Sequence, residues 1–324
     1  MRLNNKSIIA LVAAAFAITF NSCDKVDPMG VLMGSSSIND RVKAAVMYDS
    51  LLHVDLDLKN QDRIDLTQTN GKYSFLVGSD SHTLHDTGRL EEMWNDQIND
   101  PTSLFSAHLG DIIETQPEYY KTVGDVFNSY VAKYPKKFAF FPIVGNHDIT
   151  RNGWALYHST FGASTYSFRV IYPNTTSTGK KIADKFIFLD SASGTMGDYQ
   201  LDLIDNNFAQ DGSDDEFEYN NVFVFTHTNM FRPSGDEFAS TFPREELYFL
   251  LKKFAEWQCR IVFCGHVHMW DQRWYGGVEY LTLDSMGERN SPEPGDYLVK
   301  VTVDTKTGTT TWEKVHMNYV APKE

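Results

Sequence analysis

The 324-residue chain has little cysteine and a deficit of basic residues. Its three cysteines are Cys23, Cys259 and Cys264, and a disulfide between the last two, across a turn and a strand, would be geometrically awkward. Basic residues number 29 against 43 acidic ones, which gives a net charge of −14. The first shortage excludes a disulfide-rich scaffold, and the second disfavours binding to nucleic acid, because most of the surface would repel a polyanion.

Long apolar segments are also missing after the N-terminus, so the sequence predicts no internal transmembrane span and shows no internal repeats. Met1–Lys6 is basic, and the apolar stretch that follows, Ile8–Phe20, is too short to cross a bilayer comfortably. We interpret residues 1–22 as a secretory signal peptide. The chain is therefore expected to be exported to the cell envelope.

The segment Phe20-Asn21-Ser22-Cys23 resembles the lipobox of bacterial lipoproteins, in which the cysteine is lipidated and becomes the new N-terminus. This resemblance implies a membrane-anchored lipoprotein on the periplasmic or the surface face. Phe20 and Asn21 differ from the commonest residues at their positions, so an ordinary cleaved signal or an uncleaved anchor is the alternative.

Composition divides the rest of the chain. Residues 23–37 are rich in Gly, Ser, Met and Pro and are expected to form a tether. Residues 38–71 would hold a helix capped at Asn39-Asp40 and a lead-in, residues 72–316 the main domain, and residues 317–324 a tail. Without residues 1–22 the chain keeps 27 basic and 43 acidic residues, a net charge of −16.

Five apolar runs of strand-like residues lead into side chains that commonly bind metals. The runs, each with the residues that follow it, are Tyr73–Gly78 with Asp80 and His82, Leu104–Leu109 with Asp111, Phe138–Val144 with Asn146, Val222–Phe225 with His227, and Ile261–Cys264 with His266 and His268. Parallel strands covered by helices have this continuous apolar character, and open α/β sheets bind ligands beyond the carboxyl ends of their strands. We therefore expect the seven side chains to converge at one edge.

The chemistry of these seven side chains suits transition metals. Four imidazoles, two carboxylates and one carboxamide, without a thiolate, favour Mn, Fe, Zn or Ni. They exceed the needs of one ion, so two metal ions are the simpler interpretation. Asp111 lies in the middle of the ligand order and is the natural bridge, since a carboxylate can join two cations about 3.5 to 4 Å apart.

The order Asp-x-His, Gly-Asp, Gly-Asn-His-Asp, a single His and Gly-His-x-His resembles the signature of the calcineurin-like metallophosphoesterases. The resemblance implies that Asp80, His82, Asp111 and His268 hold one metal ion, and that Asp111, Asn146, His227 and His266 hold the other. It also implies a metal-activated hydroxide as nucleophile and His147 as general acid, with Asp148 orienting the His147 ring.

The same resemblance implies a metallo-dependent phosphatase-like fold, a four-layer α/β/β/α sandwich of two facing mixed sheets with outer helices. Helical patterns occupy residues 87–98, 118–133, 199–209 and 243–257. Further strands are expected at 166–171, 185–189, 278–283, 297–303 and 309–315, the last two joined as a hairpin.

Glu114 departs from the family pattern, which often has Asp, Asn or Arg three residues after the bridging Asp. Purple acid phosphatases carry a tyrosine there, so Glu114 argues against that branch. We expect Glu114 to contact a neighbouring metal ligand or a helix N-terminus. Arg232 and His85 are candidate substrate-binding residues, because a guanidinium can grip a phosphate and His85 follows the first ligand block closely.

The sequence thus predicts a hydrolase that cleaves phosphoric ester bonds, a metallophosphoesterase acting on a small mono- or diester. A pyrophosphohydrolase of a nucleotide or sugar diphosphate is an alternative, because the same centre suits that bond. A non-catalytic surface protein stabilised by its metals is another. The partners expected are a small phosphorylated substrate and, through the lipid anchor, a membrane.

Overall fold

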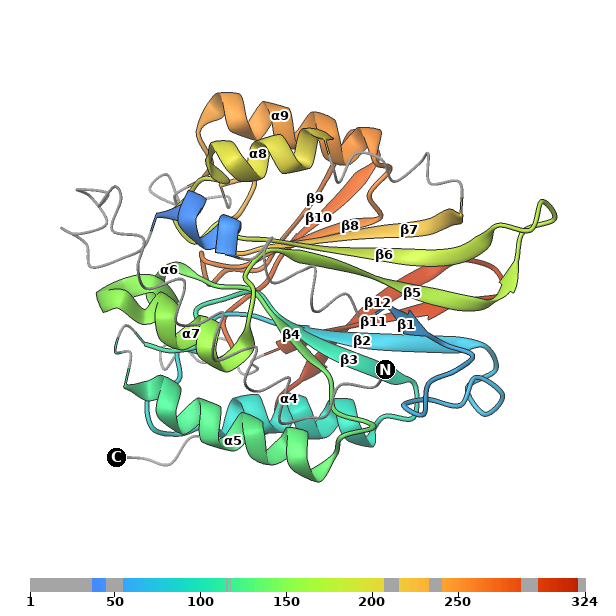
Figure 1. The fold of residues 1–324 in the computed structure, drawn as a ribbon, viewed down its shortest axis with the longest axis horizontal. Coiled ribbons are helices and arrows are strands. Elements are labelled where there is room, and N and C mark those ends of the chain that lie inside the picture. The colour runs from blue at the N-terminus through green and yellow to red at the C-terminus, as the bar shows by residue number, and fades with distance from the viewer. Residues whose placement is uncertain are drawn as a thin grey trace, which may run out of the picture.

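Two mixed β-sheets face each other in the computed structural model, and helices cover the outer face of each sheet (Figure 1). The structure describes residues 37–44, 55–114, 116, 118–206, 216–232, 241–286 and 297–319. The predicted signal peptide, Cys23 and nearly all of the tether lie outside the described residues. Within those ranges no helix is long and apolar enough to cross a membrane.

The five-stranded sheet has the order β12-β11-β2-β3-β4. Its strands are β2 (Lys72–Gly78), β3 (Ser103–His108), β4 (Phe140–Pro142), β11 (Tyr297–Asp304) and β12 (Thr310–His316). β2, β3 and β4 run parallel, whereas β11 and β12 form the expected hairpin and β11 pairs antiparallel with β2. The three parallel strands therefore end at the same edge.

The seven-stranded sheet has the order β1-β5-β6-β7-β8-β10-β9. Its strands are β1 (Leu56–Asp57), β5 (Tyr166–Thr175), β6 (Lys181–Leu189), β7 (Phe217–Thr226), β8 (Ile261–Cys264), β9 (Asp271–Tyr275) and β10 (Val278–Thr282). β6, β7, β8 and β10 are mutually parallel, so β7 and β8 also end at one edge.

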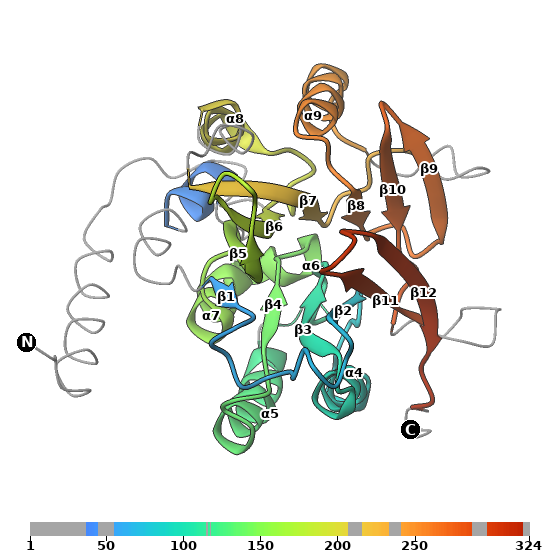
Figure 2. The ribbon, with the colours of Figure 1, turned by 90° about the vertical axis from the view of Figure 1, so that its right-hand side faces the viewer.

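Helices α4 (Gly88–Asn99) and α5 (Tyr119–Lys133) cover the five-stranded sheet, and α8 (Gly197–Asn206) and α9 (Arg244–Glu256) cover the seven-stranded sheet (Figure 2). A short segment after β4 contains α6 (Asn146–Ile149), the 3-10 turn η1 (Thr150–Asn152) and α7 (Gly153–Phe161). The arrangement confirms the predicted four-layer fold with two mixed sheets.

Aromatic side chains fill the space between the two sheets. Phe75 of the five-stranded sheet stacks on Phe105 at 5.0 Å and meets Phe186 and Phe223 of the other sheet edge-on at 5.2 Å. Each of these rings is fully buried, and burying a phenylalanine contributes about 1.5 to 3 kcal/mol. This core fixes the distance between the sheets and so brings their carboxyl edges together.

Most of the predicted elements agree closely with the structure, and the differences are local. β4 is shorter than the apolar run Phe138–Val144, and α6, α7 and β9 were not expected. Residues 38–44 are helical, but the predicted cap at Asn39-Asp40 is wrong, because the Asp40 N–H donates to Ser37 Oγ at 3.2 Å. The lead-in also contributes β1 to a sheet, and the domain boundaries themselves stay predictions.

Candidate metal centre

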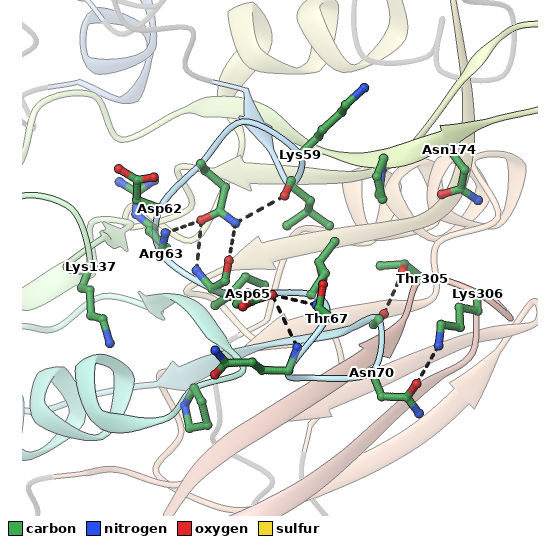
Figure 3. A pocket seen from close by; sticks show the side chains of 18 residues that line it. Lys59, Asp62, Arg63, Asp65, Thr67, Asn70, Lys137, Asn174, Thr305 and Lys306 are labelled. Atoms are coloured by element: carbon green, nitrogen blue, oxygen red, sulfur yellow. Dashed lines mark hydrogen bonds between the residues drawn. The ribbon is translucent and has the colours of Figure 1, made fainter.

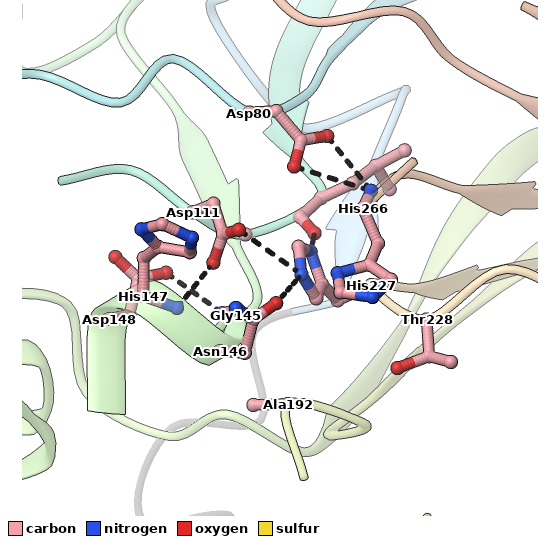
Figure 4. Close-up of polar contacts among 12 residues, drawn as sticks. Asp80, Asp111, Gly145, Asn146, His147, Asp148, Ala192, His227, Thr228 and His266 are labelled. Atoms are coloured by element: carbon pink, nitrogen blue, oxygen red, sulfur yellow. Dashed lines mark hydrogen bonds and ion pairs between the residues drawn. The ribbon is translucent and has the colours of Figure 1, made fainter. Parts of the chain in front are cut away.

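The seven predicted metal ligands meet where the carboxyl ends of the two sheets face each other. Four of them follow strands of the five-stranded sheet, namely Asp80, His82, Asp111 and Asn146, and three follow strands of the seven-stranded sheet, namely His227, His266 and His268. We expected the ligands at one edge; the structure places them at the facing carboxyl edges of two sheets. Figure 4 shows side chains from both sides pointing toward one another.

One group of potential ligands consists of Asp80, His82, Asp111 and His268, whose ligand atoms all lie within 4.8 Å of one another. His268 Nε2 is 3.4 Å from Asp80 Oδ1 and 3.0 Å from His82 Nε2. His82 Nε2 is also 3.9 Å from Asp111 Oδ2. Two carboxylates and two imidazoles at these distances form a donor set that fits one transition-metal ion.

A second group consists of Asp111, His227 and His266 and meets the same 4.8 Å limit. His227 Nε2 is 3.4 Å from Asp111 Oδ2 and 2.9 Å from Asn146 Oδ1, so the carboxamide joins this group (Figure 4). The other ring nitrogen, His227 Nδ1, lies 2.8 Å from the Leu109 carbonyl oxygen, which fixes the ring orientation. Asp111 belongs to both groups, as a bridging ligand would.

Five of these seven residues have a left-handed backbone, with φ between 42° and 75°: Asp80, His82, Asp111, His266 and His268. A residue with a side chain avoids this region, and such strain persists only where the surroundings enforce it. Hydrogen bonds do so here, since the His266 N–H donates to both Asp80 oxygens and the His147 N–H donates to Asp111 Oδ1 at 2.7 Å. The strained positions coincide with the candidate site.

Two glycines of the sequence signature allow this close approach. A Cβ on Gly145 would overlap the backbone nitrogen and carboxylate of Asp111, and a Cβ on Gly265 would overlap the side chains of Ser79 and Asp80. Only glycine lets these backbones pass the buried carboxylates. The signature glycines therefore serve packing, whereas the residues after them serve chemistry.

The electrostatics of the described groups suit cation binding. Burial raises the pKa of Asp80, but the hydrogen bond to His268 and the nearby histidines outweigh it and hold the pKa below its usual value. Burial lowers the pKa of His227, but Asp111 outweighs burial and raises it to about 9. Burial lowers the pKa of His266 to about 4. Asp80 and His266 are therefore already in the forms that bind metals, an ionised carboxylate and a neutral imidazole, whereas His227 must release its proton when a metal ion binds.

Glu114 connects His147 to the first group of potential ligands. Glu114 Oε1 is 3.1 Å from His147 Nδ1, and Glu114 Oε2 is 2.7 Å from His82 Nδ1. The two imidazole rings meet edge-on with centroids 4.6 Å apart. As expected, Glu114 contacts a candidate metal ligand, and it also holds the candidate general acid.

Asp148 does not make the contact predicted for it. Its buried carboxylate accepts hydrogen bonds from the Ile112 N–H at 3.0 Å, the Tyr120 hydroxyl at 2.8 Å and the Gly145 N–H at 2.8 Å. Burial and Asp111 raise the Asp148 pKa to about 7. The prediction that Asp148 orients His147 is wrong, because the carboxylate turns back within α6 to brace the two ligand loops.

The two candidate substrate-binding residues lie at the surface. The exposed His85 ring packs edge-on against Tyr119, with centroids 5.0 Å apart. Arg232 is exposed, and its carbonyl oxygen accepts a hydrogen bond from Arg273 at 2.7 Å. A role for either residue in substrate binding stays a prediction.

Sequence reasoning missed the loop after β6. Ser191 Oγ accepts hydrogen bonds from the backbone N–H groups of His227 at 3.0 Å and Thr228 at 2.9 Å, and Ala192 lies beside this corner of the centre (Figure 4). Asp190, one residue earlier, binds the buried Arg41. No local pattern distinguishes these residues, since a serine and an aspartate after a strand are common turn residues.

Comparison with known proteins gives a consistent result. The model of the calcineurin-like phosphoesterase family matches residues 73–270, more than half of the chain. The chain is similar in structure to GAP50, the anchor in the inner membrane complex of Plasmodium, with 16% identity and a TM-score of 0.50, over 76% of this chain and 90% of that one. No curated protein matches the sequence.

Two further solved structures are similar at lower scores. A dimetal phosphatase from Danio rerio has 11% identity and a TM-score of 0.43, over 71% of this chain and 92% of that one. The phosphopantetheinyl hydrolase of Mycobacterium tuberculosis has 13% identity and a TM-score of 0.38, over 66% and 90%. At such identities the similarity concerns the fold alone.

Proposed function

The chain belongs to the calcineurin-like phosphoesterase family, and we propose that it hydrolyses a phosphate ester of a small substrate with two metal ions. The observation that carries the proposal is the shared carboxylate. Asp111 lies in both groups of potential ligands, and each group keeps its ligand atoms within 4.8 Å. A shared carboxylate would hold two ions side by side, and such pairs of ions are used for hydrolysis at phosphorus.

When bound, two divalent or trivalent ions of Mn, Fe, Zn or Ni would supply Lewis acidity and an activated water molecule as the nucleophile. The protein's own residues then do the rest. Glu114 accepts from His147 Nδ1–H, which leaves Nε2 to carry the proton that the leaving oxygen takes. The Leu109 carbonyl and Asn146 keep the His227 ring fixed at the second group.

Charge favours a small substrate. With a net charge of −14 the surface would repel long nucleic acid, whereas a small phosphate ester can still be drawn to cations in the centre. A pyrophosphate bond of a nucleotide or sugar diphosphate suits the same residues and is the first alternative. The second is a non-catalytic protein, and the similar Plasmodium structure is described as an anchor.

A substrate screen tests the proposal. The purified full chain, reconstituted with each of the four metals in turn, is assayed against monoesters, diesters and pyrophosphates, and we expect turnover of at least one ester class. Turnover of pyrophosphates alone would favour the first alternative. A protein that holds two ions but turns over none of the three classes would refute catalysis.

Asp111→Ala is the matched variant for this screen. Because Asp111 is shared by both ligand groups, we expect the variant to lose both ions and to fall to the background rate. Elemental analysis measures the ions. Two ions per chain in Asp111→Ala would contradict the bridging role even if activity fell.

We propose that Cys23 anchors the enzyme to the cell envelope by a lipid. The support is the basic N-terminus, the short apolar run and the lipobox-like segment. Cys23→Ala is expected to move the protein from the membrane fraction to the soluble fraction. Undiminished membrane association would instead indicate an uncleaved anchor.

A further inference from the structure

A cavity of about 1070 Å³ (Figure 3) lies at the start of β2, the end of that strand opposite to the candidate metal centre. Its wall is mostly the loop of residues 58–71, with contributions from Pro101, Lys137, residues 173–174 and residues 305–306. This loop leads into the start of β2, whereas Asp80 follows its end. A seven-residue strand at roughly 3.3 Å per residue separates the two places by about 20 Å.

The cavity is basic although the chain is acidic. Four cationic side chains line it, namely Lys59, Arg63, Lys137 and Lys306, together with the carboxylates of Asp62 and Asp65. Both carboxylates are already engaged. Lys136 binds Asp62 at 2.7 Å, and Asp65 Oδ1 accepts the Thr67 N–H at 2.8 Å. The charged side chains that line the cavity are therefore mostly positive, whereas the chain as a whole has a net charge of −14.

Arg63 is the cavity residue whose charge is least compensated by its surroundings. Its Nε is buried and has no hydrogen-bond partner in the part of the chain that the structure describes. Burial lowers the pKa of Arg63, and no carboxylate among the described residues offsets that effect. Lys59 and Lys137 likewise form no ion pair with any described side chain. A partly buried guanidinium without an acceptor is costly, because burying an unpaired donor or charge loses its hydration.

The loop is ordered by its own hydrogen bonds. Gln61 Nε2 donates to the Ile64 carbonyl at 3.0 Å, and Gln61 Oε1 accepts the Ile64 N–H at 3.1 Å. Thr305 anchors the end of the loop by donating its N–H and hydroxyl to the Gly71 carbonyl at 2.9 and 2.7 Å. A site held in this way needs little reorganisation to bind a ligand.

We propose that this cavity binds a small organic anion that carries two or more carboxylate or phosphate groups. The Arg63 guanidinium takes one oxyanion in the bidentate manner typical of arginine, and the three lysines bind the remaining charge. The volume of about 1070 Å³ lies just above the range of most small-molecule sites, roughly 300 to 1,000 Å³, so a small polyanion fits with room to spare. The inference goes beyond the proposed function, since it uses no residue of the metal centre.

Isothermal titration of the full chain tests the inference. Metal is first removed with a chelator so that the candidate metal centre does not bind the probes, which are citrate and inorganic tripolyphosphate at low salt. We expect saturable one-to-one binding of at least one probe, weakened by added salt. Tighter binding of citrate would identify carboxylates as the ligand chemistry, and tighter binding of tripolyphosphate would identify phosphates.

Two matched variants locate the binding. Arg63→Gln is expected to weaken it at least tenfold, whereas Lys121→Gln, which removes one positive charge from an exposed lysine on α5, is expected to leave it unchanged. Lys137→Gln serves as the second cavity variant if Arg63→Gln does not fold. Absence of saturable binding to the wild type, unchanged binding by the cavity variants, or an equal loss in Lys121→Gln would each overturn the proposal.

Discussion

At the residue scale, Glu114 connects two side chains with different expected roles. Its two oxygens meet Nδ1 of His82 and Nδ1 of His147, so one carboxylate fixes the ring of a candidate metal ligand and that of the candidate acid. The three residues are also close enough to hold a cation themselves. However, His82 Nε2 already faces Asp111 at 3.9 Å, which assigns His82 to the first metal group.

Glu114→Gln tests this connection. The amide keeps the shape but has only one acceptor oxygen, so it can hold only one of the two imidazole N–H groups. We expect kcat to fall about 10- to 100-fold with little change in KM, and most for poor leaving groups, which need the acid. Steady-state kinetics on alkyl and nitrophenyl phosphates measures this dependence.

His147→Ala and Glu114→Asp are the controls for Glu114→Gln. His147→Ala should show the same dependence on the leaving group, and Glu114→Asp should recover part of the lost rate. A loss of bound metal in Glu114→Gln, measured by elemental analysis, would instead show that Glu114 acts on metal binding through His82 and would contradict a role centred on His147.

At the element scale, the helix at residues 38–44 contacts the loop after β6 and the start of α8. Arg41 Nε donates to Asp190 Oδ2 at 2.8 Å, and both side chains are fully buried. The residue after Asp190 is Ser191, which holds the His227 backbone. Asn39 Oδ1 also accepts the Tyr199 N–H at 3.1 Å in the first turn of α8. The N-terminal helix therefore supports the loop that positions a candidate ligand.

Arg41→Met should expose the importance of this contact. It leaves the buried Asp190 carboxylate without its counter-charge, and we expect the free energy of unfolding to fall by about 3 to 5 kcal/mol. The double variant Arg41→Met with Asp190→Asn should recover part of that loss, because no unpaired charge remains. Urea denaturation of the metal-free chain measures both.

Lys43→Met, which removes a positive charge from the exposed side of the same helix, is the control for Arg41→Met and should cost less than about 0.5 kcal/mol. A loss below about 1 kcal/mol in Arg41→Met would show that the helix contributes little to the folded domain.

At the scale of the whole molecule, a buried carboxylate links the two sheets away from the metal centre. Asp184 of β6 accepts hydrogen bonds from the hydroxyl of Tyr73, in the five-stranded sheet, and from that of Tyr172 at 2.7 Å, and Asn221 Nδ2 donates to it at 2.8 Å. Burial outweighs these hydrogen bonds and raises the Asp184 pKa from 3.8 to about 6. Asp184 thus makes stability depend on pH.

The sign of that dependence follows from the raised pKa. Between pH 3.8 and about 6 the folded state binds the Asp184 proton more tightly than the unfolded state does. The contribution of Asp184 to the free energy of unfolding is therefore fully present below pH 3.8 and is lost as pH rises through about 6. The loss is up to about 3 kcal/mol. In Asp184→Asn the contribution is absent, so the stability difference between wild type and variant should change in this range.

Urea denaturation of both proteins at several pH values measures the difference. Asp202→Asn, an exposed position on α8, is the control and should differ from wild type by a constant amount. A constant difference for Asp184→Asn as well would contradict the raised pKa of Asp184.

The sequence by itself determined the strands that carry the centre and the residue types that follow them. Continuous apolar runs predicted β2, β3 and β8 almost to the residue, because such runs are what two-sided burial requires. The ordered signature was sufficient to select seven side chains that the fold does bring together. Local propensity also predicted four outer helices, but it missed the short α6 and α7.

Only the tertiary structure decided which residues act on one another. It divided the ligands between two sheets, gave His147 to Glu114 rather than to the adjacent Asp148, and buried Arg41 against Asp190. It also placed basic side chains that form no ion pair with any described residue around a cavity formed by segments distant in the chain. The physical reason is that hydrogen bonds and ion pairs depend on side-chain direction and long-range packing, which neighbouring positions in a sequence do not specify.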